Sequence, residues 1–210
     1  MKLLRIDSSI QGESSASRIL TTAIVEQLRS AVPDLEVLAR DLAGSPLPHL
    51  TLAHLPQAHP LSIKERTHEV DDEERIASQE ALEEFLQSDV IVIGAPMYNF
   101  TIPSQLKAWI DRIVIPGQTF HYKDGRAQGL MGDKRVIIAL TRGGVFEPSA
   151  PSAAFEYASR YLLAILSFIG IHAPDVIVAE GLQLGTDQRA IGLEQAHAHI
   201  DAAVSKLAAA

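Results

Sequence analysis

Residues 90–103 read VIVIGAPMYNFTIP, and this stretch decides the fold. The run from Val90 to Gly94 has no alternating polar residues, which is typical of a central parallel strand covered by helices on both faces. After Gly94 the chain passes into a loop rich in aromatic and amide side chains. A flat heteroaromatic ligand needs apolar surface for its ring and polar groups along its edges. We therefore interpret Ala95 to Pro103 as a ligand-binding loop at the end of a buried strand.

Other short apolar runs surround this strand along the chain. Four more strands are predicted at Leu3 to Ile6, Val37 to Ala39, Val136 to Thr141 and Val176 to Ala179. Helices are predicted over Ser17 to Ser30, Asp72 to Gln87, Ser104 to Ile113, Ala153 to Ile169 and Gln188 to the C-terminus. This alternation predicts an α/β fold: a doubly wound, five-stranded parallel sheet with helices on both faces. We expect a single domain over residues 1–210, with Gly44 to Pro60 as an irregular surface excursion.

The composition narrows the classes of function. The 210 residues are 47% hydrophobic, and 18 Lys and Arg stand against 26 Asp and Glu, a net charge of -8. Such a chain has no global positive field for nucleic acid or an anionic membrane, so small-molecule chemistry is favoured. Cysteine is absent, which excludes disulfides and catalytic thiolates. Any redox chemistry must then belong to a bound cofactor.

Targeting and metal signals are weak. The N-terminus lacks a signal-peptide pattern and no apolar run could span a bilayer, so we expect a cytoplasmic protein without membrane contact. The acidic run Asp71 to Glu74 is interpreted as a solvated helix start. Four histidines match no ligand motif, so no metal site is predicted; they are His49, His54, His59 and His68.

A serine-rich loop, Asp7 to Arg18, follows the first predicted strand and leads into a helix. A helix N-terminus has unpaired N–H groups and a positive dipole end, and serine hydroxyls add donors, so the loop is a candidate anion site. It contains neither the GxGxxG nor the GxxxxGK[ST] motif. The alternative, that Ser15 or Ser17 only caps the helix, remains open.

Together these segments resemble one family. PMYNF at 96–100 is followed by QLKAWID at 105–111, and TRGG, FIGI and AEG occur at 141–144, 168–171 and 179–181. With the serine loop, they make the chain resemble the FMN-dependent NADH-azoreductases, which also act as NADH:quinone oxidoreductases within the flavodoxin-like superfamily. The resemblance covers nearly the whole chain, and PMYNF is its most specific part.

The resemblance implies a role for each matching position. The FMN phosphate is expected at Ser9, Ser15, Ala16 and Ser17, where Ala16 can offer only its backbone N–H. Met97, Tyr98, Asn99 and Phe100 are expected to line the isoalloxazine, and Thr141, Arg142, Gly143 and Gly144 to meet its pyrimidine edge. Glycines let backbone N–H groups approach a ligand where a Cβ would intrude.

The implied reaction passes two electrons from NADH or NADPH through FMN to quinones, giving hydroquinones, or to aromatic azo compounds, giving amines. A ping-pong cycle and detoxification of electrophilic quinones are implied, as is a homodimer whose subunits complete each other's sites; Trp109 and Ile110 could contribute to its interface. The cofactor carries the chemistry, so no catalytic side chain is predicted, although Asn99 and Tyr122 could polarise an acceptor.

Flat acceptors call for an aromatic pocket, and we expect Phe100, Phe120, Tyr122 and Phe168 in it. The alternative for Phe168 is core packing, which its helical spacing favours. Thr119 to Tyr122 and the turn at Lys123 to Gly125 predict an arm.

Two competing functions are a flavodoxin-type electron carrier and a non-enzymatic sensor that binds flavin or quinone.

Overall fold

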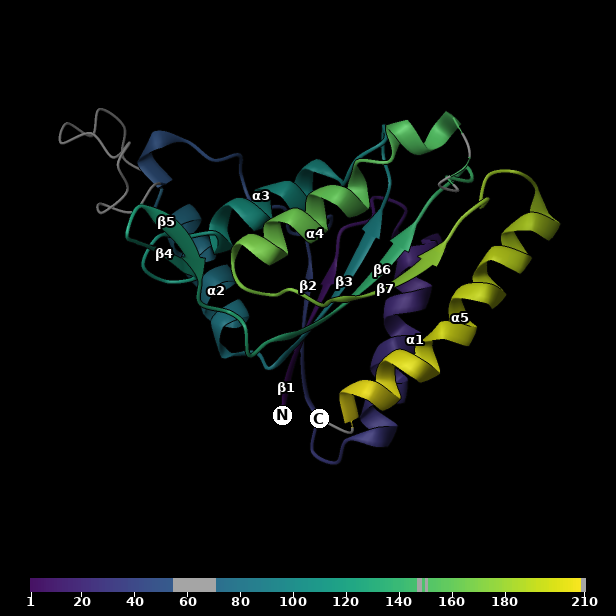
Figure 1. Cartoon of the computed structure of the whole chain (residues 1–210), viewed down its shortest axis with the longest axis horizontal. Coiled ribbons are helices and arrows are strands. Elements are labelled where there is room, and N and C mark those ends of the chain that lie inside the picture. The colour runs from purple at the N-terminus through teal and green to yellow at the C-terminus, as the bar shows by residue number, and fades with distance from the viewer. Residues whose placement is uncertain (55–70, 147–148, 150, 209–210) are drawn as a thin grey trace.

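The computed structural model describes residues 1–54, 71–146, 149 and 151–208. Its main sheet has five parallel strands in the order β2-β1-β3-β6-β7, as predicted, with β3 at the centre (Figure 1). Each strand extends the predicted run by one to three residues. The strands are β1 (Lys2–Asp7), β2 (Glu36–Asp41), β3 (Val90–Pro96), β6 (Arg135–Thr141) and β7 (Asp175–Ala179).

Helices cover both faces of this sheet, which confirms the doubly wound architecture. On one face lie α1 (Ala16–Ala31) and α5 (Thr186–Ala208), and on the other lie α2 (Asp72–Gln87), α3 (Ser104–Ile113) and α4 (Ala158–Phe168) (Figure 1). The predicted start of α4 at Ala153 is wrong. Pro151–Phe155 form a separate 3-10 turn, and the Glu156 carboxylate accepts the N–H of Ser159 at 2.9 Å. That capping bond sets where α4 begins.

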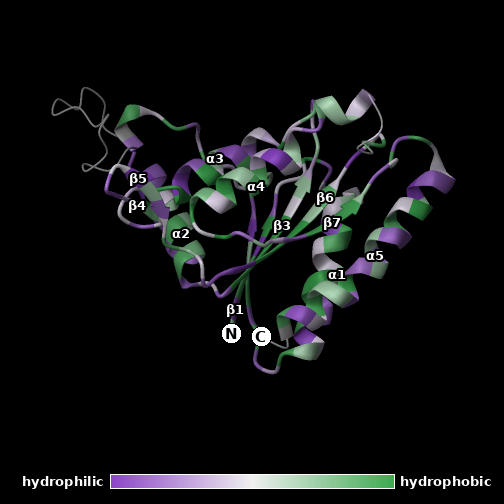
Figure 2. Cartoon of the chain, in the orientation of Figure 1, coloured by the Kyte–Doolittle hydropathy of each residue, from purple (hydrophilic) through white to green (hydrophobic). Residues whose placement is uncertain are grey.

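The central strands β3 and β6 are apolar on both faces because the sheet has a core on each side, and most of their residues are hydrophobic in Figure 2, whereas the edge strand β2 has no buried residue. Every residue of β3 is buried. The core under α2, α3 and α4 contains Phe85 and Trp109, whose rings meet edge to face at 5.9 Å. Trp109 and Ile110 are 1% and 3% exposed, so they belong to this core and cannot form a subunit interface.

A two-stranded antiparallel arm projects from the main sheet and confirms the predicted strand and turn. It consists of β4 (Phe120–Lys123) and β5 (Arg126–Gly129) (Figure 1). Asp124 and Gly125 both have positive φ, 53° and 74°, which is typical of the tight hairpin turn that matches strand twist. At its base, a Cβ on Gly129 would lie 2.1 Å from the backbone N of Gly170. The arm therefore joins the end of α4 by direct backbone contact.

The remaining predictions concern charged and histidine residues. The Asp71 carboxylate caps α2 and Asp72 pairs with Arg75 at the exposed surface, as expected of a solvated helix start. His59 and His68 lie outside the described residues. Within the described ranges, no three His, Cys, Asp or Glu residues are grouped so as to hold a metal ion. No described helix combines the length and apolarity needed to cross a membrane.

Candidate functional site

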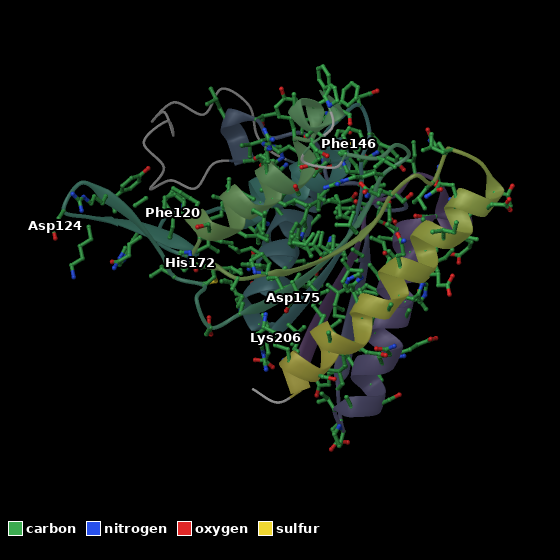
Figure 3. The ribbon with its side chains drawn as sticks, turned by 45° about the vertical axis from the view of Figure 1, so that its right-hand side comes forward. Phe120, Asp124, Phe146, His172, Asp175 and Lys206 are labelled. Atoms are coloured by element: carbon green, nitrogen blue, oxygen red, sulfur yellow. The ribbon has the colours of Figure 1, made fainter. Side chains whose placement is uncertain are left out.

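Three loops leave the carboxyl ends of the adjacent strands β1, β3 and β6, at one edge of the sheet. This edge is where ligands bind in open parallel sheets. The side chain of Phe146, which follows β6, lies at this end of the molecule, whereas Asp175 and Lys206 lie toward the opposite end (Figure 3). The three loops are residues 8–15, 97–103 and 142–146.

The first loop ends on a buried pair of serines at the start of α1. The Ser15 hydroxyl accepts the N–H of Arg18 at 3.3 Å and lies 3.0 Å from the hydroxyl of Ser17. Ser15 therefore does cap the helix, as one of the two interpretations held. The N–H groups of Ala16 and Ser17 have no intrahelical acceptor because they lie in the first turn. The cap leaves these donors for an anion. Ser15 can therefore cap the helix while the same helix start serves as an anion site.

An ion-pair network that the sequence did not predict lies behind the first loop. The Arg18 guanidinium donates to Asp41 at 2.6 Å, contacts the Ser9 carbonyl at 3.5 Å and lies 4.0 Å from Asp7. Asp7 is buried and also accepts the hydroxyl of Thr21 at 2.8 Å. Burial alone would raise the pKa of Asp41, but the hydrogen bond from Arg18 holds that pKa below its ordinary value. The network thus connects the first loop to the ends of β1 and β2.

The second loop contains a strained two-residue turn. Tyr98 and Thr101 exchange backbone hydrogen bonds of 2.9 and 3.1 Å, which forces Asn99 and Phe100 between them to φ values of 47° and 70°. Asn tolerates this left-handed region, whereas a phenylalanine there is strained. The Phe100 carbonyl accepts the N–H of Tyr157 at 3.0 Å, which anchors the turn to the start of α4. Such strain is common in loops that hold ligands.

The second loop is bonded to both of its neighbours. The Tyr98 hydroxyl lies 3.1 Å from the Ser9 hydroxyl and accepts the N–H of Ile10 at 3.2 Å. On the other side, the N–H of Met97 donates to the Thr141 carbonyl at 2.7 Å. The structure thus brings the three predicted segments into one continuous edge.

The third loop turns its carbonyls to the segment after β7. The carbonyls of Arg142, Gly143 and Gly144 accept N–H groups of residues 181–183 at 2.9 to 3.2 Å. The N–H groups of both glycines donate to no acceptor among the residues that the structure describes. A Cβ on Gly143 would lie 2.7 Å from the Gln183 side chain, whereas one on Gly144 would lie 3.5 Å from Phe146. Packing against Gln183 therefore explains why residue 143 is glycine. Among the described residues, no comparable contact requires glycine at position 144.

The Arg142 side chain is held between two carboxylates and is 11% exposed. Its guanidinium lies 3.2 Å from Glu180 and 3.4 Å from the buried Glu156. Its Nε is buried and has no acceptor in the described part of the chain. The resemblance implied an FMN contact for Arg142; the structure shows its guanidinium engaged with protein. Glu156 was missed, and Glu180 was noted only within AEG.

These donors fit a phosphorylated flavin. The start of α1 offers hydroxyls and first-turn N–H groups to a phosphate, and the second loop offers an apolar surface that includes the exposed ring of Phe100. The third loop offers the N–H groups of Gly143 and Gly144 to a polar ring edge, which needs donors when it gains electrons.

The predicted aromatic pocket does not form within one chain. Phe120 packs against Tyr122 on the arm and against Phe168 at the end of α4, with ring centroids 5.7 and 4.7 Å apart. Phe100 packs against Phe155 at 5.4 Å. The 11 residues of α4 separate the two clusters by about 16 Å. Phe168 is also 37% exposed, so the core packing that its spacing favoured is wrong.

Sequence and structure comparisons agree with this geometry. A family model described as "Flavodoxin-like fold" matches residues 1–204. The chain is 52% identical to an FMN-dependent NADH:quinone oxidoreductase of Gluconacetobacter diazotrophicus, over 94% of this chain and 96% of that one. It is 51% identical over the full length of both chains to a protein of the same name from Methylorubrum extorquens. The crystal structure of azoreductase AzrA superposes with a TM-score of 0.80 at 27% identity, covering 95% of this chain and 99% of AzrA.

Proposed function

The chain belongs to the flavodoxin-like family, and from this premise we propose that it is an FMN-dependent NADH:quinone oxidoreductase with azoreductase activity. Its likeness to enzymes of those names supports the activity. The structural observation that carries the proposal is the continuous edge formed by the loops after β1, β3 and β6. When bound, FMN supplies the chemistry: it accepts two electrons from NADH or NADPH and delivers them to a quinone or an azo compound.

The chain's residues bind and orient in this proposal. The buried hydroxyls of Ser9, Ser15 and Ser17 and the N–H of Ala16 hold the phosphate. Residues 97–100 support the ring, and the N–H groups of Gly143 and Gly144 meet its pyrimidine edge. Thr141 and Arg142 act through the loop, because the Thr141 carbonyl is bonded to Met97 and the guanidinium to Glu180. No side chain serves as a nucleophile.

A ping-pong cycle follows from having one ring to approach. In this proposal the three loops cover one face of the bound ring. The nicotinamide and the acceptor would then both approach the other face, one after the other. Two-electron reduction gives a hydroquinone directly, which supports a role in removing electrophilic quinones. A cytoplasmic site of action accords with the use of NADH.

A homodimer would unite the two aromatic clusters. Phe168, Tyr122 and Leu163 are large side chains that are 37%, 67% and 38% exposed on α4 and the arm. Exposed aromatic groups of this kind are typical of interface anchors. Because Phe120 and Tyr122 cannot reach Phe100 in the same chain, a second copy must bring its arm to the site if they are to line the acceptor pocket.

The test of the proposed function is spectroscopic. The purified protein should bind FMN and turn yellow; NADH should bleach the visible band without a reductase, and a quinone should restore it. A protein that binds no added FMN would contradict the proposal. Bound FMN that only a separate reductase protein can reduce would favour the electron carrier, and binding without turnover would favour the sensor.

The test of the dimer is the oligomeric state with and without FMN. We expect twice the chain mass by sedimentation, and we expect Tyr122→Ser to weaken acceptor turnover while FMN affinity is retained. A monomer with full quinone turnover would contradict the shared pocket.

A further inference from the structure

A charged cluster lies at the edge that the proposed function assigns to the pyrimidine end of the ring. Arg142 follows β6, Glu180 follows β7 and Glu156 precedes α4. The guanidinium of Arg142 bridges the two carboxylates at 3.2 and 3.4 Å. The cluster therefore joins three segments directly behind Gly143 and Gly144.

Glu180 makes two of these connections. One of its oxygens, Oε2, contacts Nη1 of Arg142 and also accepts the N–H of Phe146 at 3.2 Å. These two residues bracket the Gly143–Gly144 pair. The backbone adds to this, because the N–H of Gly181 donates to the Gly144 carbonyl at 2.9 Å. The carboxylate of Glu180 is thus bonded to both residues that flank the glycine pair.

The cluster carries one positive and two negative charges at neutral pH, so its net charge is negative. The side chains of Arg142, Glu156 and Glu180 are 11%, 8% and 28% exposed, and partly buried charges are screened less by salt than surface charges. Among the described residues, no second cation contacts either carboxylate. We therefore expect the cluster to add negative potential at the ligand edge of the loop.

This potential acts differently on the two redox states of a flavin. The two-electron reduction adds negative charge to the ring unless two protons accompany the electrons. A fixed negative group beside the ring disfavours the reduced form, just as like charges disfavour ionisation of a neighbour. We propose that Glu180 is a positioning residue whose carboxylate holds the Gly143–Gly144 loop and lowers the reduction potential of bound FMN. The inference rests on the proposed function and deepens it by assigning the residue that sets the driving force.

Glu180→Gln removes the negative charge of the side chain while keeping its shape. The amide has nearly the same size, and its oxygen can still accept the N–H of Phe146, so the loop retains that connection. Glu156 is a poorer target because its carboxylate also accepts the N–H of Ser159 and caps α4. The variant thus removes one negative charge with the least structural change.

A matched control comes from the other end of the same strand. Asp175 begins β7, pairs with Lys206 at 2.9 Å and lies five residues before Glu180, which is about 16 Å along the strand. In Figure 3 the side chains of Asp175 and Lys206 lie toward the opposite end of the molecule from Phe146. Asp175→Asn removes the same charge from an ion pair at a position remote from the site.

The experiment is a redox titration of the FMN-loaded proteins with a reference dye, together with titration of oxidised FMN into the apoproteins. In Glu180→Gln we expect reduced FMN to bind about tenfold more tightly relative to oxidised FMN. For a two-electron couple this ratio corresponds to a midpoint about 30 mV more positive. Asp175→Asn should leave the midpoint at that of the unchanged protein.

The outcomes separate the inference from the proposed function. An unchanged or more negative midpoint in Glu180→Gln, with FMN bound, would overturn the inference alone. Equal shifts in both variants would also overturn it, because they would reflect overall charge. Failure of the unchanged protein to bind FMN would overturn the proposed function and the inference together.

Discussion

The hydroxyl oxygens of Ser9 and Tyr98 lie 3.1 Å apart, although 89 positions separate the two residues along the chain. The same tyrosine oxygen accepts the N–H of Ile10 at 3.2 Å. One side chain thus connects the loop assigned to the phosphate with the loop assigned to the ring. In the proposed site, parts of one hydrogen-bonded unit would hold the two ends of the ligand.

Removing that hydroxyl should weaken FMN without removing the aromatic surface. Tyr98→Phe loses contacts whose net worth is about 0.5–1.5 kcal/mol each, so we expect FMN to bind roughly three- to tenfold more weakly in a fluorescence titration. Tyr157→Phe is the control, because its hydroxyl bonds to no described residue while its ring remains. Equal FMN affinity in Tyr98→Phe and the unchanged protein would show that the two loops bind independently.

Arg18 should set the preference for FMN over riboflavin. In Arg18→Gln, the Asp41 carboxylate loses its cation beside the serine loop, whereas Asp7 keeps Arg5 at 2.8 Å. The uncompensated charge of Asp41 will then repel the phosphate dianion. We expect FMN affinity to fall about tenfold, in line with the strength of charged hydrogen bonds, while riboflavin affinity stays constant. Asp41→Asn should not weaken FMN. An equal loss for both flavins would indicate general damage to the loop.

Gly144 should matter for the ligand more than for the fold. Among the described residues, a Cβ there meets only Phe146 at 3.5 Å, an ordinary contact. Gly144→Val should therefore fold normally and bind FMN at least tenfold more weakly, because its side chain enters the space for the ring. Gly129→Ala provides the contrast, since its Cβ would lie 2.1 Å from backbone and should lower the melting temperature. Normal FMN affinity in Gly144→Val would refute the placement of the ring edge.

Stability should fall in mild acid because of His54. Burial, and then the nearby Arg112, hold the pKa of His54 below its ordinary 6.5, with Glu74 partly opposing them. The unfolded chain therefore binds a proton near pH 6.5 that the folded chain takes up only at lower pH, so stability is lost as pH falls below 6.5. The loss is at most about 1.4 kcal/mol per pH unit.

Urea unfolding at pH 7.5 and 5.5 measures this effect. His54→Gln should reduce the difference in unfolding free energy between the two pH values, whereas His199→Gln, at an exposed position on α5, should not. A steeper dependence in His54→Gln would mean that protonation of His54 stabilises the fold.

Patterns of local sequence were sufficient for most of the fold. Uninterrupted β-branched runs such as 90–94 identify buried parallel strands, and α2 and α3 have the predicted bounds. The predicted start of α4 was wrong because residues 153–157 are apolar enough to continue a helix. The helix instead begins at Ala158, where the Glu156 carboxylate accepts the N–H of Ser159 in its first turn. Capping of that kind depends on one side-chain rotamer, which periodicity does not reveal.

The site was predictable only as a set of segments. The family resemblance selects the serine loop, PMYNF and TRGG, and strand order alone brings them to one edge. The roles of Arg18, Glu156 and Glu180 were missed because a charged residue next to a loop gives no sign of its partner. Arg18 pairs with Asp41 and Arg142 with Glu180, across 23 and 38 positions.

The sequence by itself determined the sheet and its helices and selected the segments proposed as ligand loops, because burial periodicity and motif chemistry are local properties. Only the tertiary structure decided which side chains share a surface. It moved Trp109 into the core, separated Phe168 from Phe100 by the length of α4, and placed Tyr98 against Ser9. The physical reason is that these contacts depend on the order in which strands pair and on the length and direction of the helices between them.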